Sequence, residues 1–321
     1  MAAELTALRV CSFRGLQNLP VIAAQRRGLL AAAGLDVTLT LTNSSAQQLA
    51  DLAAGNSDLV HTAPDNIINY DTNPAAFGLD PAHAPRAVML MGGSNGPLTV
   101  YARRGVAGLD GLRGQLVGVD NPTSGFALAL RDLLARAGLE LERDYRFSVA
   151  GGTGQRASRL IAGEIAATIL YPPFDFLAGE AGCLPLARSV TTYPAYASQA
   201  LAATTAFLNS QGATVTRYIG ALLSALRWIH EPAARQEVEA LLAAEPALGL
   251  ETASPARAYE AFTDPQRGYG ARAALDDAGL AQVIALRSRY GLPGLSLGAP
   301  ADYLNLRYYE AAVARLDTLP H

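Results

Sequence analysis

Side chains that could act as acid, base or nucleophile are few in this sequence, and they are widely spaced. His61 and Asp65 flank the end of one apolar segment, and Cys11 lies in an earlier one. A lyase or hydrolase without a cofactor would need such a group beside the reacting atom. Each also has a structural interpretation: a core histidine, an acid in the first turn of a helix, and a buried thiol. We therefore predict no catalytic residue and keep these three as the alternative set.

Several chemistries are excluded by composition. All 25 basic residues are arginines, because the sequence contains no lysine. Lysine Schiff bases and the P-loop lysine are thereby ruled out, and no cofactor is predicted. The four histidines and two cysteines show no metal-ligand spacing, so no metal is predicted either. A formal net charge of -3 with scattered arginines argues against nucleic acid as a partner.

Polar residues that suit a small ligand follow several strand-like segments. Thr123, Ser124 and Gly125 open a predicted helix, whose free N–H groups would bind a carboxylate, sulfonate or carbonyl oxygen. Arg14 would bind an anionic group with both arms of its guanidinium. The alternatives are an ordinary helix cap and a solvated arginine. The other predicted ligand contacts are Asn43, Ser44, Ser45, His61, Thr62, Asp65, Phe126, Tyr171 and Phe174. For Phe174 the alternative is core packing.

The elements that position these residues occur twice. The sequence LAAGNSDLVHTAP at 52–64 aligns without a gap with LIAGEIAATILYP at 160–172, and LLAAAGL at 29–35 matches LLARAGL at 133–139. In each half, strand-like segments alternate with helical ones, which indicates two similar α/β lobes. Each lobe is predicted to be a mostly parallel sheet covered by helices. Ligands of such sheets bind outside the carboxyl ends of the strands, so a cleft between the lobes is expected.

The lobes are expected to be joined by two crossings, at 87–102 and near 198–205. The first lobe then comprises residues 1–95 plus 203–321, and the second comprises residues 96–202. The helical segments after about residue 211 are expected to pack on the first lobe. No apolar run reaches the roughly 18 residues that a membrane-spanning helix needs.

Four segments carry a resemblance to a known family: LPVIAAQRRGLLAAAGLDV at 19–37, LAAGNSDLVHTAPDN at 52–66, the stretch from GLDGLRG to LLARAGL at 108–139, and RLIAGEIAATILYPPFD at 159–175. They resemble the type II periplasmic-binding-protein fold, in the branch of nitrate, taurine, alkanesulfonate and thiamine-pyrimidine binders. The resemblance implies a monomeric clamshell that closes on a small molecule. The predicted function is capture of a polar or anionic organic molecule with a planar part for an ABC transporter permease.

Two other classes remain open at this point. The first is a cytoplasmic enzyme on the same fold, because the resemblance also includes the desulfinase of thiophene degradation. That enzyme would place a cysteine in the loop after the first strand, where this chain has Arg14-Gly15-Leu16. The second is a ligand-sensing domain, which lacks a DNA-reading helix here. The N-terminal residues show no export signal, so the location is periplasmic if a signal peptide was removed and cytoplasmic if Met1 is native.

Overall fold

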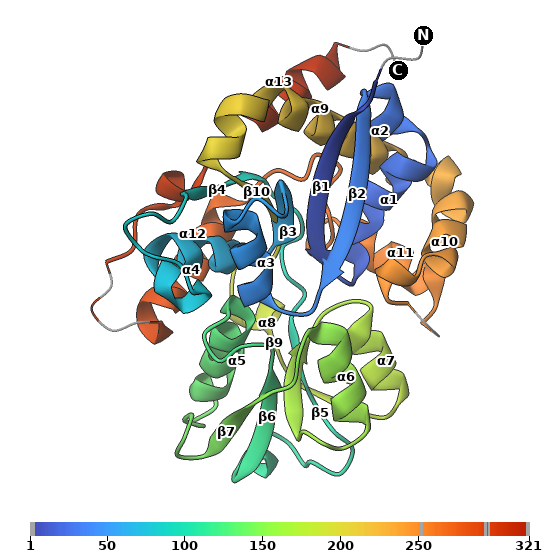
Figure 1. Cartoon of the computed structure of the whole chain (residues 1–321). Helices are drawn as coiled ribbons and strands as arrows, with labels where there is room; N and C mark the ends of the chain where they lie inside the picture. The colour runs from blue at the N-terminus through green and yellow to red at the C-terminus, as the bar shows by residue number, and fades with distance from the viewer. Residues whose placement is uncertain (1–3, 251–252, 292–293, 295, 319–321) are drawn as a thin grey trace.

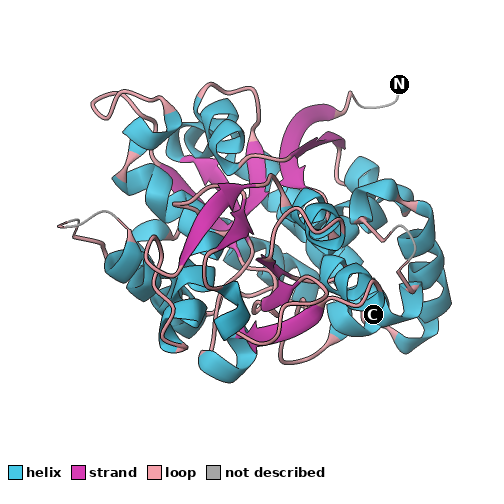
Figure 2. Ribbon diagram, turned by 90° about the horizontal axis from the view of Figure 1, so that it is seen from below, coloured by secondary structure: helices cyan, strands magenta, loops and turns pink. Residues whose placement is uncertain are grey.

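The computed structural model describes residues 4–250, 253–291, 294 and 296–318 of the chain. Within these residues the chain forms two α/β lobes, one above the other in Figure 1, each built on a five-stranded sheet. Seen from below, helices flank the strands of both sheets (Figure 2). The predicted fold class, a two-lobed α/β architecture, is therefore confirmed.

The two sheets have the same strand order. The first runs β2 (Leu35–Thr42), β1 (Thr6–Phe13), β3 (Leu59–Thr62), β10 (Ala200–Thr204) and β4 (Ala87–Met91). The second runs β7 (Tyr145–Val149), β6 (Gln115–Val119), β8 (Ala167–Leu170), β5 (Thr99–Ala102) and β9 (Leu184–Arg188). In each sheet the first three strands are parallel and the fourth is antiparallel to both its neighbours. This shared topology is the structural form of the internal repeat.

The chain crosses between the sheets twice. It leaves the first sheet after β4 and enters the second at β5, and it returns between β9 and β10. The return is complete at Ala200, which pairs with Thr62 of β3. The boundary expected at residue 202 therefore falls inside a strand of the first sheet.

Helices cover both sheets. Around the first sheet lie α1 (Leu19–Arg26), α2 (Leu29–Ala32), α3 (Ser45–Ala53), α4 (Pro64–Thr72), α9 (Thr205–Ile229), α10 (Arg235–Ala244), α11 (Pro255–Thr263), α12 (Asp277–Tyr290) and α13 (Arg307–Asp317). Around the second lie α5 (Gly125–Arg136), α6 (Thr153–Ile161), α7 (Phe174–Glu180) and α8 (Ser189–Thr192). No helix in the described part of the chain has both the length and the hydrophobicity of a transmembrane span.

Helix α9 shows how the apolar pattern builds the core of the first lobe. Its residues Val215, Ile219, Leu222, Leu226 and Ile229 recur at helical spacing and are all fully buried. They pack against strand residues of the first sheet and against α1. This helix therefore packs on the first lobe.

Helix α12 departs from the expectation that the C-terminal helices pack on the first lobe alone. It contacts α4 of the first lobe and also α5 of the second. The Tyr290 hydroxyl donates to Oδ1 of the buried Asp132 in α5 at 2.8 Å. Burial alone would raise the pKa of Asp132, but hydrogen bonds from Arg136, Tyr290 and Tyr193 outweigh burial and lower it. Helix α12 thus ties one flank of the two lobes together.

Candidate functional site

Two adjoining cavities lie between the lobes, where the parallel strands of both sheets end. They measure about 410 and about 400 Å³ when the open solvent at their mouths is counted in. Phe126, Tyr171 and Gln199 line both cavities. The two cavities are therefore compartments of one cleft, and both lobes contribute to it.

The smaller cavity, which we call the polar compartment, is built around the first turns of α5 and α6. Ser124 precedes α5, where its Oγ accepts from the N–H of Ala127 at 3.4 Å and donates to Oδ1 of Asp120 at 2.6 Å. The other oxygen of Asp120 accepts from Ser45 Oγ of the first lobe at 3.4 Å. Ser124 and Gly125 thus line the cleft, while Ser45 meets the second lobe through Asp120.

Glycines permit the close approach of the lobes at this compartment. A Cβ at Gly125 would collide with the side chain of Asp65, which belongs to α4 of the first lobe. A Cβ at Gly152, before α6, would lie 3.2 Å from Oδ1 of Asn43. The start of each helix therefore rests directly against the opposite lobe. Asn43 is placed at the cleft by this contact.

Arg156 is a cleft residue that the sequence interpretation missed. It is 1% exposed and lines the polar compartment from α6. Its guanidinium donates to Thr168 Oγ1, Thr153 Oγ1, and the carbonyls of Gly151 and Ile169, at 2.9 to 3.4 Å. Nη1 also lies 3.7 Å from Oδ1 of Asp120. Burial lowers its pKa, against the raising effect of Asp120. Arg156 thus fixes the loop before α6 and neutralises Asp120.

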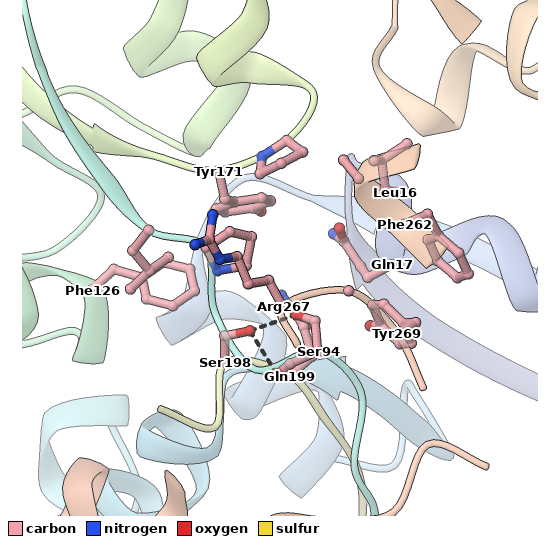
Figure 3. Close-up of a pocket in the computed structure, with 15 residues that line it drawn as sticks. Leu16, Gln17, Ser94, Phe126, Tyr171, Ser198, Gln199, Phe262, Arg267 and Tyr269 are labelled. Atoms are coloured by element: carbon pink, nitrogen blue, oxygen red, sulfur yellow. Dashed lines mark hydrogen bonds between the residues drawn. The ribbon is translucent and has the colours of Figure 1, made fainter. Parts of the chain in front are cut away.

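The larger cavity, which we call the aromatic compartment, is lined by rings from both lobes (Figure 3). Phe126 and Tyr171 of the second lobe pack edge to face, with centroids 5.7 Å apart. Phe262 and Tyr269 of the first lobe are stacked at 4.9 Å. The polar side chains of this lining are Gln17, Ser94, Ser198, Gln199 and Arg267, together with the hydroxyls of Tyr171 and Tyr269. The compartment therefore suits a ligand with an apolar, planar part.

Other predicted contacts lie at the rim of the cleft. Ser44 caps α3, where its Oγ accepts from the N–H of Gln47 at 3.2 Å. Thr123 is exposed, and its hydroxyl donates to Asn121 Oδ1 at 2.9 Å. Neither residue lines a compartment. Both hydroxyls are thus used in local hydrogen bonds, that of Ser44 in a helix cap and that of Thr123 in the loop before α5.

Arg14 and Phe174 do not line either compartment. Nε of Arg14 donates to the carbonyl of Pro246 at 2.8 Å, which directs it toward the C-terminal part of the first lobe. Phe174 is 1% exposed and packs edge to face on Tyr171, with centroids 6.0 Å apart. It also lies against Gly249 of the first lobe. Phe174 therefore supports Tyr171 from the core.

His61 and Thr62 are core residues at the end of β3. Nε2 of His61 forms a 2.9 Å hydrogen bond with the hydroxyl of the buried Tyr218 of α9. Burial lowers the pKa of His61 to about 4. Thr62 Oγ1 accepts from Nδ2 of Asn66, and it is Asn66 that lines the polar compartment. The ligand-contact prediction for this loop thus shifts from His61 and Thr62 to Asn66.

The depressed pKa of His61 predicts a loss of stability in acid. In the unfolded chain this histidine has its ordinary pKa near 6.5 and binds a proton below that pH. In the folded protein it is not protonated until the pH falls to about 4. The stabilisation is complete above pH 6.5 and is lost as pH falls toward 4, by about 3 kcal/mol. We expect denaturant titrations between pH 7 and 4 to show this extra loss in wild type relative to His61→Gln. Parallel stability curves for the two proteins would contradict the assignment.

Asp65 is held in a buried ion pair. Its carboxylate accepts from Nε and Nη2 of Arg287 in α12, at 2.6 and 2.5 Å. Nη1 of Arg287 donates to Asn69 at 2.8 Å, and Nη2 donates to the carbonyl of Thr123 in the second lobe at 2.6 Å. Asp65 does not line either compartment. Its role in this structure is to hold the arginine that joins the lobes.

Cys11, the third alternative catalytic residue, is 5% exposed within β1. Burial raises the pKa of its thiol, so the group stays protonated at neutral pH. Among the described residues, no group of His, Cys, Asp and Glu side chains is arranged to hold a metal ion. The three alternative catalytic residues thus lie apart from the cleft lining.

The sequence contained a signal for some missed residues but not for others. Arg156 falls on the buried stripe of α6 with Ala157 and Leu160, and a charge on such a stripe indicates a buried polar contact. Phe262, Arg267 and Tyr269 reach the cleft from the C-terminal region of the first lobe. No local pattern placed that segment at the cleft.

Comparison with known proteins agrees with this architecture. The model of the NMT1-like family matches residues 1–243. The chain belongs to the NMT1-like family. A search of curated proteins finds no match. The predicted family resemblance is therefore confirmed.

Solved structures share the fold of this NMT1-like protein at low sequence identity. The periplasmic nitrate-binding protein NrtA from Synechocystis PCC 6803 has a TM-score of 0.83 at 14% identity, over 99% of this chain and 91% of that one. The alkanesulfonate-binding protein SsuA from Xanthomonas axonopodis pv. citri, bound to MOPS, has a TM-score of 0.65 at 19% identity. The match covers 90% of this chain and 92% of that one. The desulfurization enzyme DSZB has a TM-score of 0.63 at 16% identity, and the match covers 96% of this chain and 99% of that one. These likenesses establish the fold.

Proposed function

We propose that this chain is a solute-binding protein that captures a small polar or anionic organic molecule with a planar part for an ABC importer. The observation that carries the proposal is the divided cleft between the lobes, lined from both sheets at their strand ends. Ligands of open α/β sheets bind at such ends. The nitrate-binding and alkanesulfonate-binding neighbours support the class. A monomer delivering its ligand to a permease in the periplasm goes with this function.

Contacts across the cleft support a clamshell. On one flank, Arg287 of the first lobe donates to the carbonyl of Thr123 in the second. On the other, the guanidinium of Arg257 in α11 lies 4.0 Å above the ring of Phe176 in α7. A ligand that touches both lobes stabilises the arrangement in which these contacts form. Binding and closure are then one equilibrium.

The enzyme alternative has less support. It draws on the likeness to the desulfurization enzyme. However, the imidazole of His61 is hydrogen-bonded to Tyr218, and the carboxylate of Asp65 is paired with Arg287. The thiol of Cys11 is buried within β1. General acid–base catalysis needs a titrating group within hydrogen-bond reach of the substrate. Binding without turnover fits these positions better.

Native mass spectrometry of the purified full chain tests the proposal. We expect a retained small molecule that is released on denaturation. When it is returned to the protein and incubated, it should be recovered chemically unchanged. Absence of any retained molecule would contradict capture. Its conversion to a product, abolished in His61→Gln or Asp65→Asn, would replace the binding function with the enzyme.

A further inference from the structure

The aromatic compartment contains an arginine without a partner. Arg267 lies in the loop between α11 and α12, where its backbone N–H donates to Oδ1 of Asp264 at 2.9 Å. Its side chain crosses the compartment and directs its guanidinium toward Phe126 and Tyr171 of the opposite lobe (Figure 3). Within the described part of the chain, no hydrogen-bond acceptor or carboxylate pairs with this guanidinium. Its donors are free to bind a ligand.

The charges of the cleft single out this group. Among the described residues, the charged side chains that line the two compartments are Asp120, Arg156 and Arg267. Arg156 uses its donors on Thr168, Thr153 and two backbone carbonyls, and its charge lies 3.7 Å from Asp120. The polar compartment is thus close to neutral. The positive charge available to a ligand is that of Arg267.

The surroundings of Arg267 select for a ring. Phe126 and Tyr171 stand on one side of the compartment, and the stacked Phe262 and Tyr269 on the other. A small inorganic anion would leave these faces uncovered, whereas a planar ring would pack against them. A planar guanidinium matches the geometry of a carboxylate, sulfonate or phosphate. Ring and anionic group can therefore be bound together.

We propose that Arg267 is the residue that makes the cleft specific for a ring-bearing organic anion. The ring lies in the aromatic compartment, and the carboxylate, sulfonate or phosphate group binds Arg267. The proposal deepens the binding function proposed above and rests on it. Phe262, Arg267 and Tyr269 lie beyond residues 1–243, which the family model matches. The proposed contact to the anionic group is thus made by a segment that follows the part of the chain that the family model matches.

Calorimetric titration of the full chain with five probes tests the proposal. The ring anions are benzoate, benzenesulfonate and phenyl phosphate, and the controls are neutral benzamide and ringless nitrate. We expect at least one ring anion to bind more than tenfold tighter than either control, since it alone combines a charge-assisted hydrogen bond to Arg267 with ring contact. Which of the three binds identifies the anionic group. Arg267→Gln should remove this preference and leave the weak binding of benzamide unchanged.

Arg272→Gln is the matched control. Arg272 lies five residues further along, is exposed, and pairs with Asp317 away from the cleft. The Arg272→Gln variant should bind the ring anion with the same dissociation constant as the wild-type protein. Unchanged ring-anion affinity in Arg267→Gln, or equal affinity for benzamide, would overturn the proposal. A retained molecule that is neutral or ringless would also overturn the role proposed for Arg267, but it would leave the binding function standing. Absence of any retained molecule or bound probe would contradict both the role of Arg267 and the binding function.

Discussion

Arg287→Met is expected to lower the free energy of unfolding by about 3 to 5 kcal/mol, because it leaves the carboxylate of Asp65 buried without its counter-ion. Both side chains are only 2% exposed, so water cannot replace the lost partner. The acceptors on Asn69 and Thr123 lose their donor as well. Urea denaturation at pH 7 measures the change. A variant as stable as wild type would show that the ion pair does not hold the lobes.

Two controls separate the ion pair from a general effect of helix α12. Arg289→Met changes a neighbouring arginine that is 63% exposed and lies 3.4 Å from Asp132, so its effect should stay below about 1 kcal/mol. Asp65→Leu combined with Arg287→Met removes both charges at once. This double variant should be more stable than Arg287→Met alone, because no unpaired charge remains buried.

Phe126→Ala combined with Tyr171→Ala should weaken ligand binding on the order of a thousandfold. Both rings line both compartments, so their loss removes apolar contact on either side of the cleft. Aromatic anchors at the centre of a site contribute about 2 kcal/mol or more each when truncated. Titration with the molecule released from the wild-type protein, or with the best-binding ring anion, gives the two dissociation constants.

Phe147→Ala is the control for these substitutions. Phe147 lies in β7 and packs edge to face on Tyr145, with centroids 5.8 Å apart, outside both compartments. Its loss affects the core of the second lobe but should leave the dissociation constant unchanged. Affinity that survives the double substitution would place the ligand elsewhere.

The fold was predictable because its signals are local and repeated. The gapless match between 52–64 and 160–172 marks equivalent helix–turn–strand units, the end of α3 with β3 and the end of α6 with β8. Ser124 was predictable as a helix cap for the same reason. A cap depends on three or four consecutive residues, and the structure forms it as expected.

The cleft was only partly predictable because its lining is set by distant contacts. The sequence makes Asp65 a candidate ligand contact, but in the fold its carboxylate is bound by Arg287, 222 residues later in the chain. His61 was in the same position with respect to Tyr218. In the other direction, Arg267 enters the cleft from a loop whose sequence carries no periodicity. Local sequence patterns locate the loops. Whether a side chain in a loop is already paired or is available to a ligand depends on residues that are distant in the sequence.

The position of β10 has a consequence for synthesis on the ribosome. This strand lies between β3 and β4, yet it follows the whole of the second lobe in the chain. When only the first 95 residues have been made, β3 and β4 each have an unpaired edge, because the strand that lies between them has not yet been synthesised. The second lobe is continuous and can fold as a unit as soon as it leaves the exit tunnel. The N-terminal half of the first lobe must wait for residues 200–204, so the insert folds before its host.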